Sequence, residues 1–180
     1  DHLTTLADDL LDLTRAETTG LALEPAETLV APLVEDEVQK LAPLAVQKGV
    51  SVSSYVAADL SLIADGMRLR RVLHNLISNA ISYSRSEGGE VRISAGQDVE
   101  GGWIRIDDNG IGLSDEEKGK VFQRFWRGEQ ARQSQRRGAG LGLAISQEIV
   151  RAHGGRIEVH SQPGLGSSFI LKFPSQIEPN

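Results

Sequence analysis

One amphipathic helix that carries two asparagines limits most tightly what this chain can fold into. Residues 71–85 read RVLHNLISNAISYSR, and the spacing predicts a helix whose apolar stripe consists of Leu73, Leu76, Ile77, Ala80 and Ile81. Asn75 and Asn79 share the neighbouring stripe, about one turn apart. Asparagine is a mediocre helix former because its amide competes for backbone hydrogen bonds. The pair therefore indicates either buried hydrogen-bonding side chains or a face that meets a ligand.

The segments around this helix alternate between helix and strand patterns. Helices are expected at 32–48, about 66–83, from Ser114 and at 141–155, and strands at 50–56, 90–96, 103–108 and on both sides of a turn at 163–166. Ser114 precedes three acidic residues that suit a helix N-terminus. Mixed helices and antiparallel hairpins predict an α/β sandwich with the helices on one face of the sheet.

Composition excludes several classes of function. The 180 residues suit one domain, and the net charge of −6 argues against a dedicated nucleic-acid binder. Without cysteine there are no disulfides and no zinc–thiolate sites, which is compatible with a reducing cytoplasm. No apolar run approaches the ~18 residues of a membrane span. The chain starts at Asp1 and not at Met, so we expect a fragment of a longer protein.

Three glycine-containing stretches could bind an anion or a nucleotide: 107–114, 138–144 and 163–169. The second opens a helix, whose N-terminal backbone N–H groups favour anions. It lacks the preceding strand of a dinucleotide fingerprint, and the chain has no Walker A sequence. The first cannot be a calcium loop, because Ile111 and Lys118 would fall at ligand positions. An arginine-rich loop at 126–139 is long enough to need a functional reason.

The order of these motifs resembles the catalytic and ATP-binding domain of sensor histidine kinases, within the superfamily of gyrase, Hsp90 and MutL. The four boxes of that family match here as the N box 75–83, the G1 box 108–112, the F box 122–125 and the G2 box 138–143. The resemblance covers about residues 30–174. It implies a Bergerat-type ATP-binding fold, with a mixed, largely antiparallel sheet packed on about three helices.

The resemblance also implies a role for each matched residue, with ATP and Mg²⁺ as cofactors. Asn79 would hold Mg²⁺, Asp108 would accept a hydrogen bond from the adenine amino group, and Tyr83 would stack on the base. Asn75 and Arg124 would act on the phosphates during catalysis. The full set implied to bind ATP is Asn75, Asn79, Tyr83, Asp108, Gly110, Gly112, Phe122, Gly138, Gly140, Leu141, Gly142 and Leu143. One departure is Ser82, where many family members carry a lysine that reaches a phosphate.

Asn75 also discriminates between branches of the superfamily. The ATP-hydrolysing branch has a glutamate at this position to activate water, and an amide cannot serve as a general base. We therefore expect a kinase that transfers the γ-phosphate of ATP to a histidine on a dimerisation helix, for relay to a response regulator. The alternatives are a serine kinase of the anti-sigma-factor type, which the helical lead-in disfavours, and a non-catalytic nucleotide-sensing module, which only Ser82 supports.

The resemblance divides the chain into two parts. Residues 1–20 would be the end of the dimerisation helix and a linker, and 21–180 the catalytic domain. None of the four histidines has the setting of a phosphoacceptor, so the chain alone is not expected to phosphorylate itself. Its expected partners are its own dimerisation domain, as a homodimer in the full protein, and a response regulator, with no nucleic acid. The domain would be cytoplasmic, and the full-length protein an inner-membrane sensor.

Overall fold

The computed structural model describes residues 20–128 and 139–175. The expected end of the dimerisation helix, in residues 1–19, lies outside this part of the chain, as does Gly138. Along the described residues the elements are β1 (Ala26–Leu29), α2 (Val30–Lys48), β2 (Val50–Tyr55), β3 (Ser61–Ala64), α3 (Gly66–Tyr83), β4 (Gly89–Asp98), β5 (Gly101–Asp108), α4 (Asp115–Lys118), α6 (Gly142–Ala152), β6 (Arg156–Gln162) and β7 (Gly166–Pro174).

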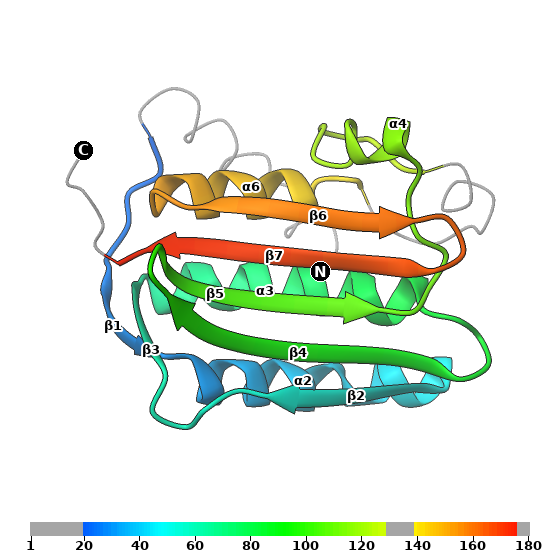
Figure 1. Cartoon of the computed structure of the whole chain (residues 1–180), viewed down its shortest axis with the longest axis horizontal. Helices are drawn as coiled ribbons and strands as arrows, with labels where there is room; N and C mark the ends of the chain where they lie inside the picture. Colours follow the sequence, from blue (N-terminus) through cyan, green and yellow to red (C-terminus); the bar gives the residue numbers. More distant parts are fainter. Residues whose placement is uncertain (1–19, 129–138, 176–180) are drawn as a thin grey trace.

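Five strands form the main sheet in the order β2-β4-β5-β7-β6 (Figure 1). The β2–β4 pair is parallel and the other three pairs are antiparallel. A separate antiparallel pair, β1 and β3, lies at the edge of the molecule. The mixed, largely antiparallel sheet expected from the sequence is therefore confirmed.

Three helices, α2, α3 and α6, cover one face of the main sheet (Figure 1). Alternate residues of the strands point toward these helices and are almost fully buried, namely Val91, Ile93, Ile104, Ile106 and Leu171. The apolar stripe predicted for α3 meets them, and all five of its members are at most 5% exposed. The observed fold is thus the expected two-layer sandwich, in which the sheet packs on three helices and α3 lies in the centre of the helical layer.

Two local predictions differ from the structure. The strands β1 and β3 were not predicted, because four residues each are too few to show an alternating pattern. The helix α2 begins at Val30, two residues before the predicted start at Pro32, and continues through Pro43. The short helix after Ser114 is confirmed as α4, with a complete capping box between Ser114 and Glu117.

Candidate functional site

The N-terminus of α3 is fixed by a cap that also reaches α6. The side chain of Asp65 accepts a hydrogen bond from the N–H of Arg68 at 3.0 Å, as an N-cap does. The N–H of Asp65 donates to Nε2 of the buried His153 at 2.9 Å. Nδ1 of His153 lies 2.7 Å from the carbonyl oxygen of Ile149 and therefore carries the ring proton. Both nitrogens of His153 are thus engaged in holding α3 against α6.

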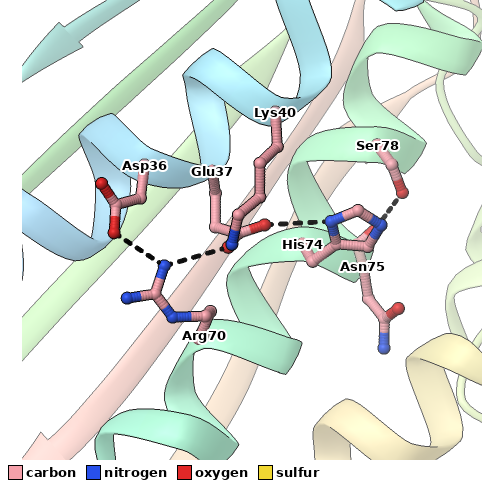
Figure 2. A network of polar contacts seen from close by, with 7 residues as sticks. All are labelled: Asp36, Glu37, Lys40, Arg70, His74, Asn75 and Ser78. Atoms are coloured by element: carbon pink, nitrogen blue, oxygen red, sulfur yellow. Dashed lines mark hydrogen bonds and ion pairs between the residues drawn. The ribbon is translucent and has the colours of Figure 1, made fainter.

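A buried carboxylate fixes α3 to its other neighbour, α2. The Glu37 side chain is only 2% exposed and contacts Lys40 at 2.7 Å, Arg70 at 3.3 Å and Nδ1 of His74 at 3.0 Å (Figure 2). Burial raises the pKa of Glu37, but the hydrogen bonds from Lys40, His74 and Arg70 outweigh it and hold the pKa below 4.5. Glu37 is therefore ionised at neutral pH. Since a carboxylate only accepts, Nδ1 of His74 donates to it.

This network around Glu37 was not predicted, although the sequence carries a signal for it. Glu37 lies in the acidic run 35–37, which is typical of a solvated helix face. It also lies three residues after Val34 and four before Leu41, on the buried stripe of α2. A charged residue on an apolar stripe predicts buried ionic partners on the facing helix.

The network predicts an asymmetric effect on stability. Arg70→Met removes one donor from a carboxylate that stays buried, and should lower the free energy of unfolding by about 1.5–3 kcal/mol. Glu37→Met removes the buried charge itself and leaves partly exposed cations that water can solvate, so it should stay within about 1 kcal/mol of the parent. Urea unfolding at pH 7 measures both values.

The double variant Glu37→Met/Arg70→Met is the control, and it should be more stable than Arg70→Met alone. Folding lowers the pKa of Glu37 from its ordinary value of 4.5. The contribution of the ionised carboxylate to the free energy of unfolding is therefore present above pH 4.5 and is lost as the pH falls through the lowered pKa. Equal losses in the two single variants would contradict the assignment.

Asn75 points away from this network, toward α6 (Figure 2). Its side-chain Nδ2 donates to the carbonyl oxygen of Gly142 at 3.1 Å and to Oγ of Ser146 at 3.3 Å. The amide of Asn79 is half-buried and makes no hydrogen bond with any residue that the structure describes. The two asparagines therefore differ: Asn75 joins α3 to the first turn of α6, whereas the amide of Asn79 has no partner within the described part of the chain.

The C-terminal end of α3 meets the loop after β5. The carbonyl oxygen of Tyr83 accepts a hydrogen bond from the N–H of Ile111 at 3.2 Å. A Cβ atom at Gly110 would overlap that carbonyl oxygen, and one at Gly112, which has a φ of +67°, would overlap the carbonyl oxygen of Gln162. Both glycines are therefore required by the protein's own backbone. Their close approach to a base stays a prediction of the resemblance.

Asp108 is half-buried at the end of β5, beside these glycines. Burial raises its pKa to about 6, although the N–H groups of Gly110 and Ser167 donate to the carboxylate and lower it. The N–H of Gly110 lies 2.8 Å from Oδ1. Among the described carboxyl groups, Asp108 has the most strongly raised pKa. Such shifts concentrate at functional sites.

Gly166 lies in the glycine-containing stretch 163–169, and its contact with β5 was not predicted. Gly166 has a φ of +99°, and a Cβ atom there would overlap the carbonyl oxygen of Asp108. The turn between β6 and β7 therefore packs directly on the Asp108 backbone. Its sequence PGLG, with glycines two apart, was the available signal.

The two described ends of the 126–139 loop lie together. The N–H of Phe125 donates to the carbonyl oxygen of Gly140 at 2.9 Å. Phe125 is 60% exposed and has a φ of +60°, a strained conformation for a non-glycine residue. Phe122 is half-buried, and Arg124 is exposed on the same segment. Three arginines of this arginine-rich loop, Arg132, Arg136 and Arg137, lie outside the described residues.

The leucines at the start of α6 serve the core. Leu141 is 1% exposed, and its carbonyl oxygen accepts the first helical hydrogen bond, from Ile145 at 2.9 Å. Leu143 is partly buried against the same core. Only backbone groups of Leu141 can therefore face a ligand. Gly140, with a φ of +70°, provides the turn into the helix.

The most prominent cavity of the described chain is separate from this site. A cavity of about 310 Å³ lies between β3 and the β4–β5 hairpin, at the other end of β5 from Asp108, and none of the expected site residues lines it. No helix within residues 20–128 and 139–175 is long and apolar enough to span a membrane. The same residues contain no cluster of three or more histidine, aspartate or glutamate side chains that would hold a metal ion.

The candidate site is thus the region where three motifs meet on α3. The middle of α3 contacts the start of α6 through Asn75, and its end contacts the loop after β5 through Tyr83. Asn79 stands one turn from each of these contacts. Its neutral amide oxygen is a hard ligand that fits a Mg²⁺ ion whose other ligands are waters and phosphates.

Comparison with known proteins agrees with this arrangement. Sensor histidine kinase MtrB of Mycobacterium leprae is 37% identical over 178 residues, which are 97% of this chain and 31% of that protein. The Acinetobacter baumannii histidine kinase AdeS superposes with a TM-score of 0.81 at 26% identity, over 97% of this chain and 79% of that one. Full-length ShkA in complex with AMPPNP gives a TM-score of 0.84 at 28% identity, over 99% of this chain and 37% of that one.

The chain therefore spans about a third of the length of the curated relative. A family model described as histidine kinase-, DNA gyrase B- and HSP90-like ATPase matches residues 64–177, from the end of β3 to beyond β7. This match takes in α3, the loop after β5, the start of α6 and the turn on Asp108, which are the parts that form the candidate site. The chain belongs to the family of histidine kinase-, DNA gyrase B- and HSP90-like ATPases.

Proposed function

We propose that the site on α3 binds ATP together with Mg²⁺, and that in the longer protein it transfers the γ-phosphate to a histidine of the dimerisation domain. The observation that carries this proposal is the position of Asn79 between two contacts of α3, one with α6 and one with the loop after β5. Full-length ShkA, which superposes on this chain with a TM-score of 0.84, is a complex with AMPPNP, an ATP analogue. This complex supports the choice of nucleotide.

Each residue then has a defined task. The carboxylate of Asp108 accepts a hydrogen bond from the adenine amino group, and Tyr83 contacts the base. Asn79 is the ligand for Mg²⁺, which neutralises phosphate charge when it is bound. Backbone N–H groups at the start of α6, from Gly140 to Leu143, face the phosphates with the positive end of the helix dipole. Phe122 and Arg124 also bind the nucleotide, with Arg124 directed to phosphate, and Gly138, which the resemblance adds to this set, lies outside the described residues.

The amide at position 75 favours a kinase over a hydrolase. Its nitrogen is committed to Gly142 and Ser146, and an amide has no basic group that could activate water. Bound ATP is thereby preserved for transfer. In the transfer, the bond between the γ-phosphorus and its bridging oxygen breaks, a bond between phosphorus and the acceptor nitrogen forms, and ADP leaves.

The described histidines of this chain are poor acceptors. His153 is buried with both ring nitrogens engaged, and Nδ1 of His74 is held by Glu37. His160 lies in the strand β6, and His2 is outside the described residues. We therefore propose that the acceptor belongs to a separate dimerisation domain that forms the homodimer. The phosphate would pass from there to a response regulator, and this domain would work in the cytoplasm.

Phosphotransfer to an added domain tests the proposed function. The chain is incubated with γ-labelled ATP and Mg²⁺, alone and with the dimerisation domain of the same protein. We expect acid-labile label on the added domain and none on the chain by itself. A dimerisation domain whose acceptor histidine is replaced by glutamine is the control. Label on the isolated chain, or equal label on the control domain, would contradict the proposal.

A further inference from the structure

The hydroxyl of Ser146 is enclosed where α6 meets α3. Ser146 is 0% exposed, so water cannot replace its hydrogen bonds. Its Oγ donates to the carbonyl oxygen of Gly142 at 2.8 Å, one turn earlier in α6. The same Oγ accepts from Nδ2 of Asn75 at 3.3 Å, and this nitrogen also donates to the Gly142 oxygen at 3.1 Å. Three polar groups on two helices thus form a closed triangle.

The triangle fixes which end of the Asn75 amide faces α6. The carbonyl oxygen of Gly142 can only accept, so the Asn75 atom beside it must be the nitrogen. The single proton of Ser146 is already given to Gly142, which leaves only lone pairs for Asn75. Both neighbours therefore demand a donor, and the amide oxygen is left on the side away from them. Figure 2 shows the Asn75 side chain directed to α6 in this way.

We propose that Ser146 is a positioning residue for the nucleotide site: its hydroxyl holds the Asn75 amide so that Oδ1 is presented beside Asn79. This inference rests on the proposed function. An oxygen at that point accepts from waters around Mg²⁺, whereas a flipped amide would present N–H groups to a cation and repel it. Without the hydroxyl, the amide nitrogen keeps one acceptor, Gly142, in place of two.

Ser146→Ala tests the proposal, because alanine is a good helix former and, being smaller than serine, introduces no steric clash. Calorimetric titration with Mg²⁺–ATP, with ATP in EDTA and with adenosine separates the phosphate end of the site from the base end. We expect the affinity for Mg²⁺–ATP to fall about 3–10-fold, the loss of one hydrogen bond. The affinity for adenosine should not change. Ser146→Thr, which keeps a hydroxyl, should restore Mg²⁺–ATP binding.

The matched control is Ser168→Ala, which removes another buried serine hydroxyl. Ser168 is 7% exposed, and its Oγ has no hydrogen-bond partner among the described residues. This variant should bind all three ligands as the parent does. A second readout needs no nucleotide: the side-chain amide protons of Asn75, identified by their loss in Asn75→Ala, should exchange faster with solvent in Ser146→Ala.

The outcomes separate this inference from the proposed function. Unchanged Mg²⁺–ATP affinity in Ser146→Ala would overturn the positioning role while leaving the ATP site intact. An equal loss for adenosine and Mg²⁺–ATP would show a general packing effect and would also overturn it. If the parent itself failed to bind ATP, the proposed function would be wrong and this inference would fall with it, whatever the amide exchange rates.

Discussion

Asn79→Ala should remove most of the Mg²⁺-dependent part of ATP binding without harming the fold. Loss of a metal ligand is expected to cost at least as much as loss of an outer-shell partner, which is about 10–100-fold in metal affinity. The side chain is half-buried and has no hydrogen-bond partner in the described chain. Alanine is also the better helix former, so the free energy of unfolding should rise by about 0.5 kcal/mol. ATP titration with and without Mg²⁺, together with urea unfolding, measures both effects.

Two variants make this result specific. Asn79→Asp keeps an oxygen ligand and should retain Mg²⁺-dependent binding. Ser78→Ala, one residue earlier, removes a hydroxyl that donates to the carbonyl oxygen of Asn75 at 3.2 Å, and should leave Mg²⁺ dependence unchanged. If Asn79→Ala bound Mg²⁺–ATP as tightly as the parent, the assignment of the metal ligand would be wrong.

If Asn79→Ala stabilises the fold and abolishes Mg²⁺-dependent ATP binding, the result would also explain why α3 carries asparagine at unfavourable positions. A helix of this length gains nothing locally from asparagine at its centre. Asn75 is compensated by its hydrogen bonds to α6, whereas Asn79 has no such compensation within the described chain. The cost at Asn79 is therefore a reason to expect a ligand there.

The parts of the fold that could be predicted from the sequence are those with a repeated local pattern. The apolar stripe of α3 and the alternation in β4, β5 and β7 predicted a sheet covered by helices on one face. The strand β3 has four residues and gave no pattern. Its place is determined by pairing with β1, whose residues lie 32 to 38 positions earlier in the chain, from Leu29 opposite Ser61 to Ala26 opposite Ala64. The local sequence of β3 does not indicate that pairing.

Contacts between helices were the part of the site that could not be predicted. The spacing of the boxes put Asn75 and Gly142 in one site, but the hydrogen bond between them depends on how α3 and α6 pack. Glu37 and Ser146 look ordinary in sequence, an acid in an acidic run and a serine in a helix. Their meaning comes from Arg70 and Asn75 on the facing helix, which only the fold brings within reach.

Asp108→Asn should weaken ATP binding and shift the preference toward guanine. Loss of a hydrogen bond to a charged acceptor costs roughly 1.5–3 kcal/mol, which is about 10–150-fold in affinity. An asparagine can keep accepting from the N–H of Gly110 through its oxygen, and it then offers an N–H to the base. This donor opposes the amino group of adenine and suits the carbonyl oxygen of guanine. Competition between ATP and GTP on both proteins measures the change in their ratio.

The pH dependence of the same variant shows that the ionised carboxylate is the group at work. Burial raises the pKa of Asp108 to about 6, so ATP affinity should be highest above that pH and fall as the pH drops through it. Asp108→Asn cannot titrate, and the ratio of parent to variant affinity cancels the titration of the phosphates themselves, whose pKa is also about 6. Because the raised pKa makes the ionised form costly to bury, the folded parent loses stability as the pH rises through 6, and Asp108→Asn should not. The range from about pH 5 to about pH 8 runs from about one unit below that pKa to about two units above it. If the ratio of parent to variant ATP affinity stayed constant over this range, Asp108 would not accept a hydrogen bond from the base.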